Sequence, residues 1–396
     1  MTLMSKKKTV LLAFSALAFA GGMTACTKEV ITPVQIEFGR KYDADLPLWD
    51  YDSTSRTYKV GNVKDIDYDH LADSSSGLVG RKLNFVLLIA DVTTDCNCFA
   101  KFRSSITSYI QSSNAFFYSI NPSEFKDKDT LGLKVSTAEG SESIAIFENG
   151  AVKYQRQRAG EADTWSTNAD TFKTWMNARV KVSNMLYIDV LQLEKLVVDP
   201  SLFTGTDHAV IGYFRDRCPD CSYLSDHFLK NYNLTEHAES YVIDCDVPGL
   251  HDPKDGTTAS TTESKAQWTA FKALYGLAKS SDPEFGFDTG YVPAFQFRRA
   301  DSVYDMAVYV NDSLALNSDQ STCSIASTYW DGTRSHDFFT SLASTVATNF
   351  LTIDALKSIP SSDYEEDSGD YYWAHDKAAV YHDPLMKGFL DYYISK

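Results

Sequence analysis

The chain has 396 residues and a formal net charge of −16, and 43% of its residues are hydrophobic and 13% aromatic. An acidic surface repels the phosphate backbone of DNA and RNA, so this charge argues against a nucleic-acid-binding protein. Beyond the N-terminus no stretch reaches the roughly 20 apolar residues that cross a bilayer, so we expect the rest to be soluble and globular, with enough apolar material for two cores.

The N-terminus has the organisation of an export signal. Residues 6–8 are all lysine, and residues 9–20 form an apolar segment that is too short for a membrane-spanning helix. Small residues then precede Cys26, which resembles the lipobox of bacterial lipoproteins, with Met23 where that family usually has leucine. The resemblance implies that residues 1–25 are a signal peptide and that Cys26 carries two acyl chains such as palmitate, because stable anchoring takes two chains. The alternative is an ordinary signal peptide followed by an incidental cysteine.

An internal repeat becomes visible when the chain is aligned with itself at an offset of 122 residues. The offset places Ile66 on Ile188 and, without a gap, Cys96 on Cys218. The expected organisation is a tether with irregular structure at 26–62, a first repeat at 63–181 and a second repeat at 182–396.

Both repeats show the same alternation of strands and helices. An apolar run of strand length meets a cysteine motif that opens a helical pattern, and a strand, a strand pair and a closing helix follow. In the first repeat we expect these elements at 83–90, 97–111, 115–120, 143–147 with 152–155, and 168–179. In the second we expect them at 208–214, 219–232, 241–245, 294–297 with 306–310, and 335–350. Strands and helices that alternate around a mixed sheet indicate an α/β fold.

Further elements lie outside this shared plan. A strand is expected at 34–38, and Asn149-Gly150 predicts a tight hairpin in the first strand pair. The second repeat has a longer connection before its strand pair, in which a helix is expected at 265–279. It also has an insert at about 311–333, and an amphipathic helix at 382–396 is expected to pack on this repeat.

The chain has seven cysteines, of which Cys26 is assigned to lipid. The others are even in number, as disulfide chemistry in an exported protein would require. Four of them form two tight pairs, Cys96 with Cys98 and Cys218 with Cys221. Such short-range pairs constrain little of the chain, so chemistry explains them better than stability does.

In the second repeat, the order strand, Cys-x-x-Cys, helix favours a reactive thiol at Cys218. A cysteine at a helix N-terminus lies near unpaired amides and the positive end of the helix dipole, which favour its thiolate. Arg215 and Arg217 add positive charge, while Asp220 opposes it. Cys221 follows one helical turn later, close enough to form or break a disulfide with Cys218.

Residues 213–221, Tyr-Phe-Arg-Asp-Arg-Cys-Pro-Asp-Cys, resemble the motif of the thioredoxin-like superfamily, in the variant of the bacteriocin transport accessory proteins. Residues 289–297 resemble the cis-proline segment of that superfamily. The resemblance implies two tandem thioredoxin-like domains, each a mixed sheet flanked by helices. It also implies that Cys218 forms a mixed disulfide, that Cys221 resolves it and that Pro293 supports the substrate.

Two positions of this site depart from the family pattern. Arg217 stands where the family has tryptophan, and Gly212 stands where it often has a buried acid. We expect Arg217 to tune the Cys218 thiolate. An inert structural disulfide is one alternative, and zinc is another, although zinc needs two further ligands and only His227 is near in sequence.

The pair in the first repeat is less similar to the family. Glu142 stands where the cis-proline is expected. A Cys96–Cys98 disulfide would be strained and therefore easily reduced, so the pair is either a second redox pair or part of a degenerate domain kept for packing or partner binding. Cys245 and Cys323 either form a disulfide or remain separate thiols.

Together these features predict an extracytoplasmic thiol–disulfide oxidoreductase, lipid-anchored to the cell membrane and needing no metal or organic cofactor. Its partners would be protein thiols or disulfides outside the cytoplasm, together with a membrane redox partner that recycles the thiol pair. The alternative is a non-catalytic surface lipoprotein whose thioredoxin-like domains are interaction scaffolds with inert cysteines.

Overall fold

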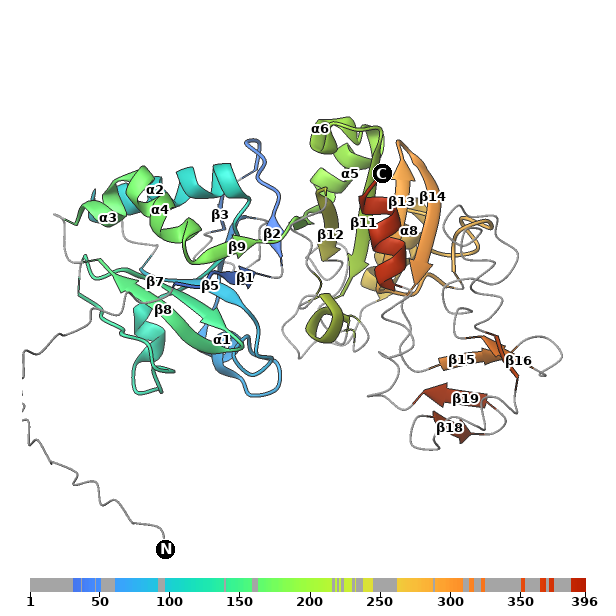
Figure 1. Ribbon diagram of the computed structural model, residues 1–396, viewed down its shortest axis with the longest axis horizontal. Coiled ribbons are helices and arrows are strands. Elements are labelled where there is room, and N and C mark those ends of the chain that lie inside the picture. Colours follow the sequence, from blue (N-terminus) through green and yellow to red (C-terminus); the bar gives the residue numbers. More distant parts are fainter. Residues whose placement is uncertain are drawn as a thin grey trace, which may run out of the picture. The chain divides into compact units, whose positions relative to one another are not determined.

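A computed structural model of the protein, drawn in Figure 1, separates residues 1–32 from a larger compact unit formed by residues 33–396. All elements below belong to the larger unit. No helix in the described part of the chain is long and apolar enough to cross a membrane. The structure describes residues 31–36, 38–46, 48–50, 61–91, 97–138, 140–158, 163–215, 218, 221, 224–229, 232, 238–244, 262–287, 289–308, 313–316, 322–324, 350–352, 364–367, 370–373 and 386–396.

The first repeat contains a six-stranded mixed sheet with the order β3-β4-β6-β5-β7-β8. Strands β3, β4, β6 and β5 run parallel to one another, β7 is antiparallel to β5, and β8 is antiparallel to β7. Asn149 and Gly150 have φ values of 53° and 74°, so they form the predicted tight turn between β7 and β8. The strands are β3 (Trp49–Asp50), β4 (Val63–Asp65), β5 (Phe85–Ile89), β6 (Phe117–Ile120), β7 (Ser143–Glu148) and β8 (Ala151–Gln157).

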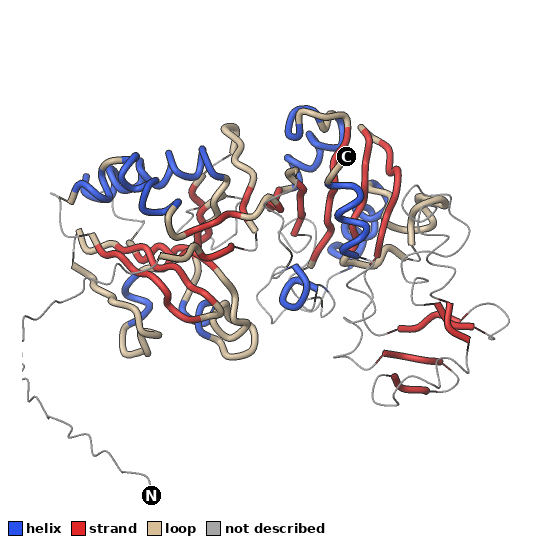
Figure 2. Tube along the Cα trace, in the orientation of Figure 1, coloured by secondary structure: helices blue, strands red, loops and turns tan. Residues whose placement is uncertain are grey.

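Helices cover both faces of this sheet, as Figure 2 shows in blue. Val86 and Leu88 of β5 pack into one core with α2 and α4, whereas Phe85 and Leu87 pack into another with α1 and η1. Because successive strand residues point to opposite faces, a strand covered on both sides reads as a continuous apolar run. The helices are α1 (Tyr68–Ala72), α2 (Asn97–Ser113), the 3-10 turn η1 (Pro122–Phe125), α3 (Thr164–Thr167) and α4 (Ala169–Asn177).

The second repeat contains a sheet with the order β14-β13-β11-β12-β10-β2. Here β2, β10, β12 and β11 run parallel to one another, β13 is antiparallel to β11, and β14 is antiparallel to β13. Apart from β2 and β3 at the edges, the two sheets share one strand order and one pattern of directions. A mixed sheet of this order with flanking helices is consistent with a thioredoxin-like fold. The strands are β2 (Gly39–Arg40), β10 (Met185–Ile188), β11 (His208–Phe214), β12 (Ser240–Asp244), β13 (Ala294–Arg299) and β14 (Ser302–Val308).

The offset of 122 residues is visible in the structure at the first helix of each repeat. Asp67 caps α1, because its carboxylate accepts a hydrogen bond from the amide of His70 at 2.8 Å. Asp189 caps α5 (Val190–Val198) in the same way, because its carboxylate accepts a hydrogen bond from the amide of Gln192 at 2.7 Å. An aspartate at this position satisfies amides that the helix itself leaves unpaired. Each repeat therefore begins with an equivalent strand, β4 or β10, followed by a capping aspartate and a helix.

The helices of the second repeat pack on one continuous core. Helix α8 (Thr262–Leu274) lies in the long connection where a helix is predicted at 265–279. The helix at 386–394 agrees with the amphipathic helix predicted near the C-terminus, and it buries Met386, Phe389 and Tyr393 in this core. The remaining helical elements are α6 (Ser201–Thr204) and the π-helical turn η2 (Leu224–Leu229). The π-helical turn differs from the regular α-helix predicted at 219–232.

The segment at 26–62, predicted as a tether with irregular structure and a strand at 34–38, contains three short strands in its described part. Strand β1 (Val34–Ile36) pairs with β9 (Val180–Val182), while β2 and β3 extend the edges of the two sheets. Strands of two or three residues are specified by the edge they pair with rather than by a local pattern. For that reason the sequence indicated only the strand at 34–38.

The closing helix predicted at 335–350 is wrong at its described end, because Phe350 lies in a strand; residues 335–349 lie outside the described residues. That strand belongs to a five-stranded sheet with the order β17-β16-β15-β19-β18. Its pairings join segments that are distant in the chain, which local periodicity does not reveal. The strands are β15 (Ser313–Leu316), β16 (Thr322–Ser324), β17 (Phe350–Thr352), β18 (Tyr364–Asp367) and β19 (Asp370–Trp373).

Candidate active site at Cys218 and Cys221

The buried strand β11 ends at Phe214 and leads directly to two thiols, Cys218 and Cys221. The amide of Cys218 donates to the carbonyl of Arg215 at 3.2 Å, which turns the chain back at the end of the strand. The amide of Cys221 lies 3.4 Å from the sulfur of Cys218, and the amide of Arg215 lies 3.3 Å from the sulfur of Cys221. Cys218 is half-buried, whereas Cys221 is only 2% exposed. The site thus has one partly exposed cysteine and one buried cysteine next to it.

The segment before β13 forms the other side of this site. Tyr213 pairs with Ala294, so the antiparallel register brings the residues before β13 next to the end of β11. There the peptide bond between Val292 and Pro293 is cis, and both residues are buried. The sulfur of Cys218 donates to the carbonyl oxygen of Val292 at 3.3 Å. The structure therefore places Cys218 next to Cys221 and next to the Val292 carbonyl, directly before Pro293.

Two of the other cysteines singled out in the sequence lie in other elements. Cys98 belongs to the first turn of α2, but its side chain is not described, and Cys323 lies in β16. No three histidine, cysteine or acidic side chains gather into a metal-binding group within the described part of the chain. The residues singled out in the sequence that lie outside the described ranges are Cys26, Cys96, Arg217, Pro219, Asp220 and Cys245.

Aromatic rings fill the space next to Gly212, where the thioredoxin-like family often has a buried acid. A Cβ at this position would lie 2.7 Å from the ring of Phe295 and 3.0 Å from the ring of Phe214. These two rings pack edge to face, with centroids 5.5 Å apart. An acid does not fit there unless both rings move.

The sequence did not identify two residues of α8 that contact the site. The guanidinium carbon of Arg215 lies 5.7 Å from the centroid of the Trp268 indole ring, and the ammonium group of Lys272 lies 5.5 Å from it. Lys272 also donates to the carbonyl of Thr289 at 2.5 Å, just before the segment that leads to Pro293. The i, i+4 spacing of Trp268 and Lys272 on a predicted helix is the only signal in the sequence, and it does not indicate what they contact.

In the first repeat, Glu142 precedes β7 as Pro293 precedes β13. Its carboxylate accepts a hydrogen bond from the guanidinium of Arg158 at 3.3 Å, and its carbonyl accepts one from the Arg158 amide at 2.7 Å. The side chain of Arg158 is 1% exposed and that of Glu142 is 11% exposed. A buried ion pair thus lies at the place where the second repeat has a backbone carbonyl that faces a thiol.

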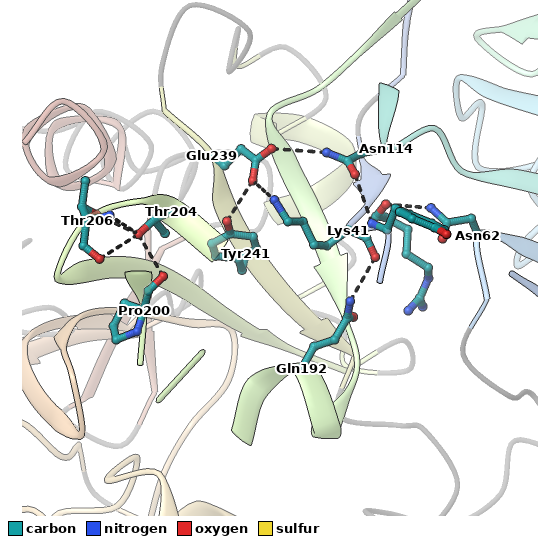
Figure 3. A network of polar contacts seen from close by, with 11 residues as sticks. Lys41, Asn62, Asn114, Gln192, Pro200, Thr204, Thr206, Glu239 and Tyr241 are labelled. Atoms are coloured by element: carbon teal, nitrogen blue, oxygen red, sulfur yellow. Dashed lines mark hydrogen bonds and ion pairs between the residues drawn. The ribbon is translucent and has the colours of Figure 1, made fainter. Parts of the chain in front are cut away.

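A separate cluster of polar side chains surrounds Glu239 (Figure 3). The Glu239 carboxylate accepts three hydrogen bonds: from the ammonium of Lys41 at 2.5 Å, from the side-chain amide of Asn114 at 3.2 Å and from the hydroxyl of Tyr241 at 2.9 Å. Gln192 donates to the carbonyl of Lys41 at 3.0 Å. Burial and the nearby Glu239 carboxylate raise the pKa of Tyr241. These groups hydrogen-bond to one another and hold the chain after β2, so we assign the cluster a structural role.

No model of a known protein family matches the chain, and no curated protein matches it. Among solved structures, human ERp44 in a zinc-bound form aligns at 12% identity over 53% of this chain and 59% of its own, with a TM-score of 0.20. ERdj5 in its crystal form I aligns at 10% identity over 61% of this chain and 27% of its own, with a TM-score of 0.21. The chain thus spans less than two thirds of either neighbour. Scores this low carry no argument, so the fold assignment rests on the strand order and directions.

Proposed function

We propose that the protein is a thiol–disulfide oxidoreductase that exchanges disulfides with partner proteins through Cys218 and Cys221. The supporting observation is the environment of the half-buried Cys218 sulfur. It lies 3.4 Å from the amide of Cys221 and 3.3 Å from the carbonyl of Val292, directly before Pro293. One reachable thiol with a second thiol behind it is the arrangement that a mixed-disulfide mechanism requires.

The exchange proceeds in two steps with Cys218 as the nucleophile. Its thiolate attacks one sulfur of a partner disulfide, which forms a disulfide between Cys218 and the partner and releases the other partner sulfur as a thiolate. The Cys221 thiolate then attacks the sulfur of Cys218, which closes the Cys218–Cys221 disulfide and releases the second partner sulfur. Both released thiolates take up protons. Two electrons pass to the partner, and the same steps run in reverse when a partner dithiol meets the oxidised pair.

Backbone amides favour the reactive form of both sulfurs. Hydrogen bonds donated to a sulfur stabilise its charged form more than its neutral form. The amide of Cys221 points at Cys218, and the amide of Arg215 points at Cys221. Arg217 is assigned to add positive charge next to Cys218, and Pro293 to support the partner backbone.

We further propose that two tandem thioredoxin-like domains, at 63–181 and 182–396, act outside the cytoplasm. The shared strand order of the two sheets supports the tandem arrangement. The composition of residues 1–25 supports export, with anchoring to the membrane through lipid on Cys26. A membrane redox partner that gives or takes two thiol electrons would recycle the Cys218–Cys221 pair, and none of these steps needs a metal or organic cofactor.

For the first domain we favour an interaction or packing role. The buried pair of Glu142 and Arg158 lies where the second domain presents the Val292 carbonyl to its thiol. Cys96 and Cys98 would then contribute little to the exchange reaction.

A redox titration of the full-length chain in detergent tests the proposed function. The protein is equilibrated in graded glutathione buffers, and the thiol state of each cysteine is read by mass spectrometry. We expect Cys218–Cys221 to titrate reversibly between about −120 and −270 mV. We expect Cys221→Ser to accumulate mixed disulfides that are absent from Cys218→Ser, with Cys323→Ser as the control that behaves like the original chain. A pair that resists reduction below about −300 mV would instead favour the scaffold function.

A further inference from the structure

We propose that helix α8 positions both backbone segments that flank the thiol pair, through Trp268 and Lys272. This inference rests on the proposed exchange at Cys218 and Cys221, and it identifies residues that hold that site in shape. Helix α8 belongs to the connection between β12 and β13. The corresponding connection of the first repeat, between β6 and β7, has only the short turn η1 in its described part.

Lys272 fixes the loop that leads to Pro293. Its ammonium group donates to the carbonyl of Thr289 at 2.5 Å. Its aliphatic chain packs closely on Gly290, because a Cβ there would lie 2.8 Å from the Cδ of Lys272. Gly290 also has a φ of +87°, which favours glycine. The loop is thus held against α8 at two successive residues, and two residues later Val292 presents its carbonyl to Cys218.

Trp268 fixes the segment on the other side of the site. Two cations contact its indole ring. The guanidinium carbon of Arg215 lies 5.7 Å from the ring centroid, and the Lys272 ammonium lies 5.5 Å from it. The indole also stacks on the ring of Phe271, with centroids 5.6 Å apart, and Phe271 is buried in the core. Trp268 is therefore anchored by the core while it attracts two cations.

Arg215 carries this support to the sulfurs through its backbone. Its amide donates to the sulfur of Cys221, and its carbonyl accepts from the amide of Cys218. Trp268 and Lys272 are four residues apart, so they lie on one face of α8. A shift of this helix would move Arg215, and with it both the amide that donates to the Cys221 sulfur and the carbonyl that accepts from the Cys218 amide. Because reaction rates fall steeply when reacting groups are misplaced by about 1 Å, we assign Trp268 and Lys272 as positioning residues.

A matched pair of substitutions at Lys272 in the full-length chain tests this role. Lys272→Met keeps the aliphatic chain that packs on Gly290 but removes the donor and the charge, whereas Lys272→Arg keeps both. We expect Lys272→Met to slow exchange with oxidised glutathione about tenfold and to raise the pH at which iodoacetamide alkylation of Cys218 is half-maximal. Lys272→Arg should stay within about twofold of the original chain. Lys265→Met, at an exposed position of the same helix, is the control and should change neither reading.

Trp268→Leu provides an independent second variant. It should reproduce the effects of Lys272→Met, and the double variant should be less impaired than two independent effects would give, because the Lys272 ammonium also contacts the Trp268 ring and so couples the two residues. Circular dichroism identifies any variant that does not fold, and the other variant then decides the result.

The outcomes separate this inference from the proposed function. If folded Lys272→Met and Trp268→Leu exchange and alkylate like the original chain, the positioning role is overturned while the oxidoreductase function stands. An equal loss in Lys272→Met and Lys272→Arg overturns it as well. If the original chain does not exchange at all, the proposed function fails, and the alkylation profile of Cys218 still decides the positioning role.

Discussion

The segment before β7 in the first repeat differs in its chemistry from the segment before β13 in the second. In the second repeat the Val292 carbonyl accepts a hydrogen bond from the sulfur of Cys218. In the first repeat Glu142 and Arg158 form a buried ion pair in the corresponding place. A shared architecture thus carries a thiol contact in one case and an ion pair in the other, which agrees with the general rule that chemistry depends on the site rather than on the fold.

The register explains why the same place is involved in both repeats. Ile89 at the end of β5 pairs with Ser143 at the start of β7, and Tyr213 near the end of β11 pairs with Ala294 at the start of β13. In each sheet the preceding segment therefore lies next to the end of the strand that leads to the cysteines. The fold determines where a contact can form, and the residue types in that segment determine its chemistry.

The repeats also use the same aromatic–cation contact for different purposes. In the first repeat the Arg156 guanidinium carbon lies 4.6 Å from the centroid of Trp165, whose ring packs with Phe102 of α2 in the core. In the second repeat the indole of Trp268 faces Arg215 next to the thiols. The first contact joins a helix to the sheet, and the second lies next to the two thiols.

The largest expected effect in this comparison comes from Glu142→Ala. The substitution removes the carboxylate that faces the buried Arg158 guanidinium, and we expect it to destabilise the first repeat by about 3 kcal/mol. Hydrogen exchange of the β7 and β8 amides, read by mass spectrometry in urea, measures this loss. Glu148→Ala is the control, because its pair with Lys153 is partly exposed and should contribute less than about 1 kcal/mol. Equal losses in the two variants would show that burial does not set the value of the Glu142 pair.

Gly212→Ala should have the next largest effect, confined to the second repeat. The added methyl group meets the rings of Phe214 and Phe295, and overpacking of this kind destabilises by about 2 kcal/mol. Exchange of the β11 and β13 amides measures it. Gly205→Ala is the comparison, because nothing lies within 4 Å there and only its φ of +70° opposes a side chain, at about 1 kcal/mol. A neutral Gly212→Ala would contradict our conclusion that the rings leave no room for an acid.

The smallest effect is a loss of stability at alkaline pH that both repeats should share. Burial raises the pKa of Tyr109, in the first repeat, to about 12. The folded state then holds this proton more tightly than the unfolded chain, whose tyrosine pKa is about 10. The contribution is therefore complete below pH 10 and is lost as the pH rises through 12, which gives about 1 kcal/mol of lost stability by pH 11.

Burial likewise raises the pKa of Tyr275, in the second repeat, to about 12. Urea unfolding at pH 8 and pH 11 tests both residues. Tyr109→Phe and Tyr275→Phe should each reduce the alkaline loss of stability. A loss that neither substitution changes would assign the effect to other groups.

Local patterns in the sequence determined the elements on which the thiol site is built. The apolar run at 208–214 forms β11, and the cysteine motif that follows brings two sulfurs together. The offset of 122 residues corresponds to two sheets of equal strand order. These features could be read from the chain because strand burial, turn chemistry and close cysteine spacing depend on residues that are neighbours in sequence.

Only the tertiary structure decided the features that depend on distant residues. Three features have no signal in their own segments: the edge strands β2 and β3, the ion pair of Glu142 with Arg158, and the five-stranded sheet formed by β15 to β19. The contacts of α8 with Arg215 and Thr289 are of the same kind. Each depends on a partner that folding brings near, so the sequence by itself indicated the pair of cysteines but not the helix that we propose holds it in position.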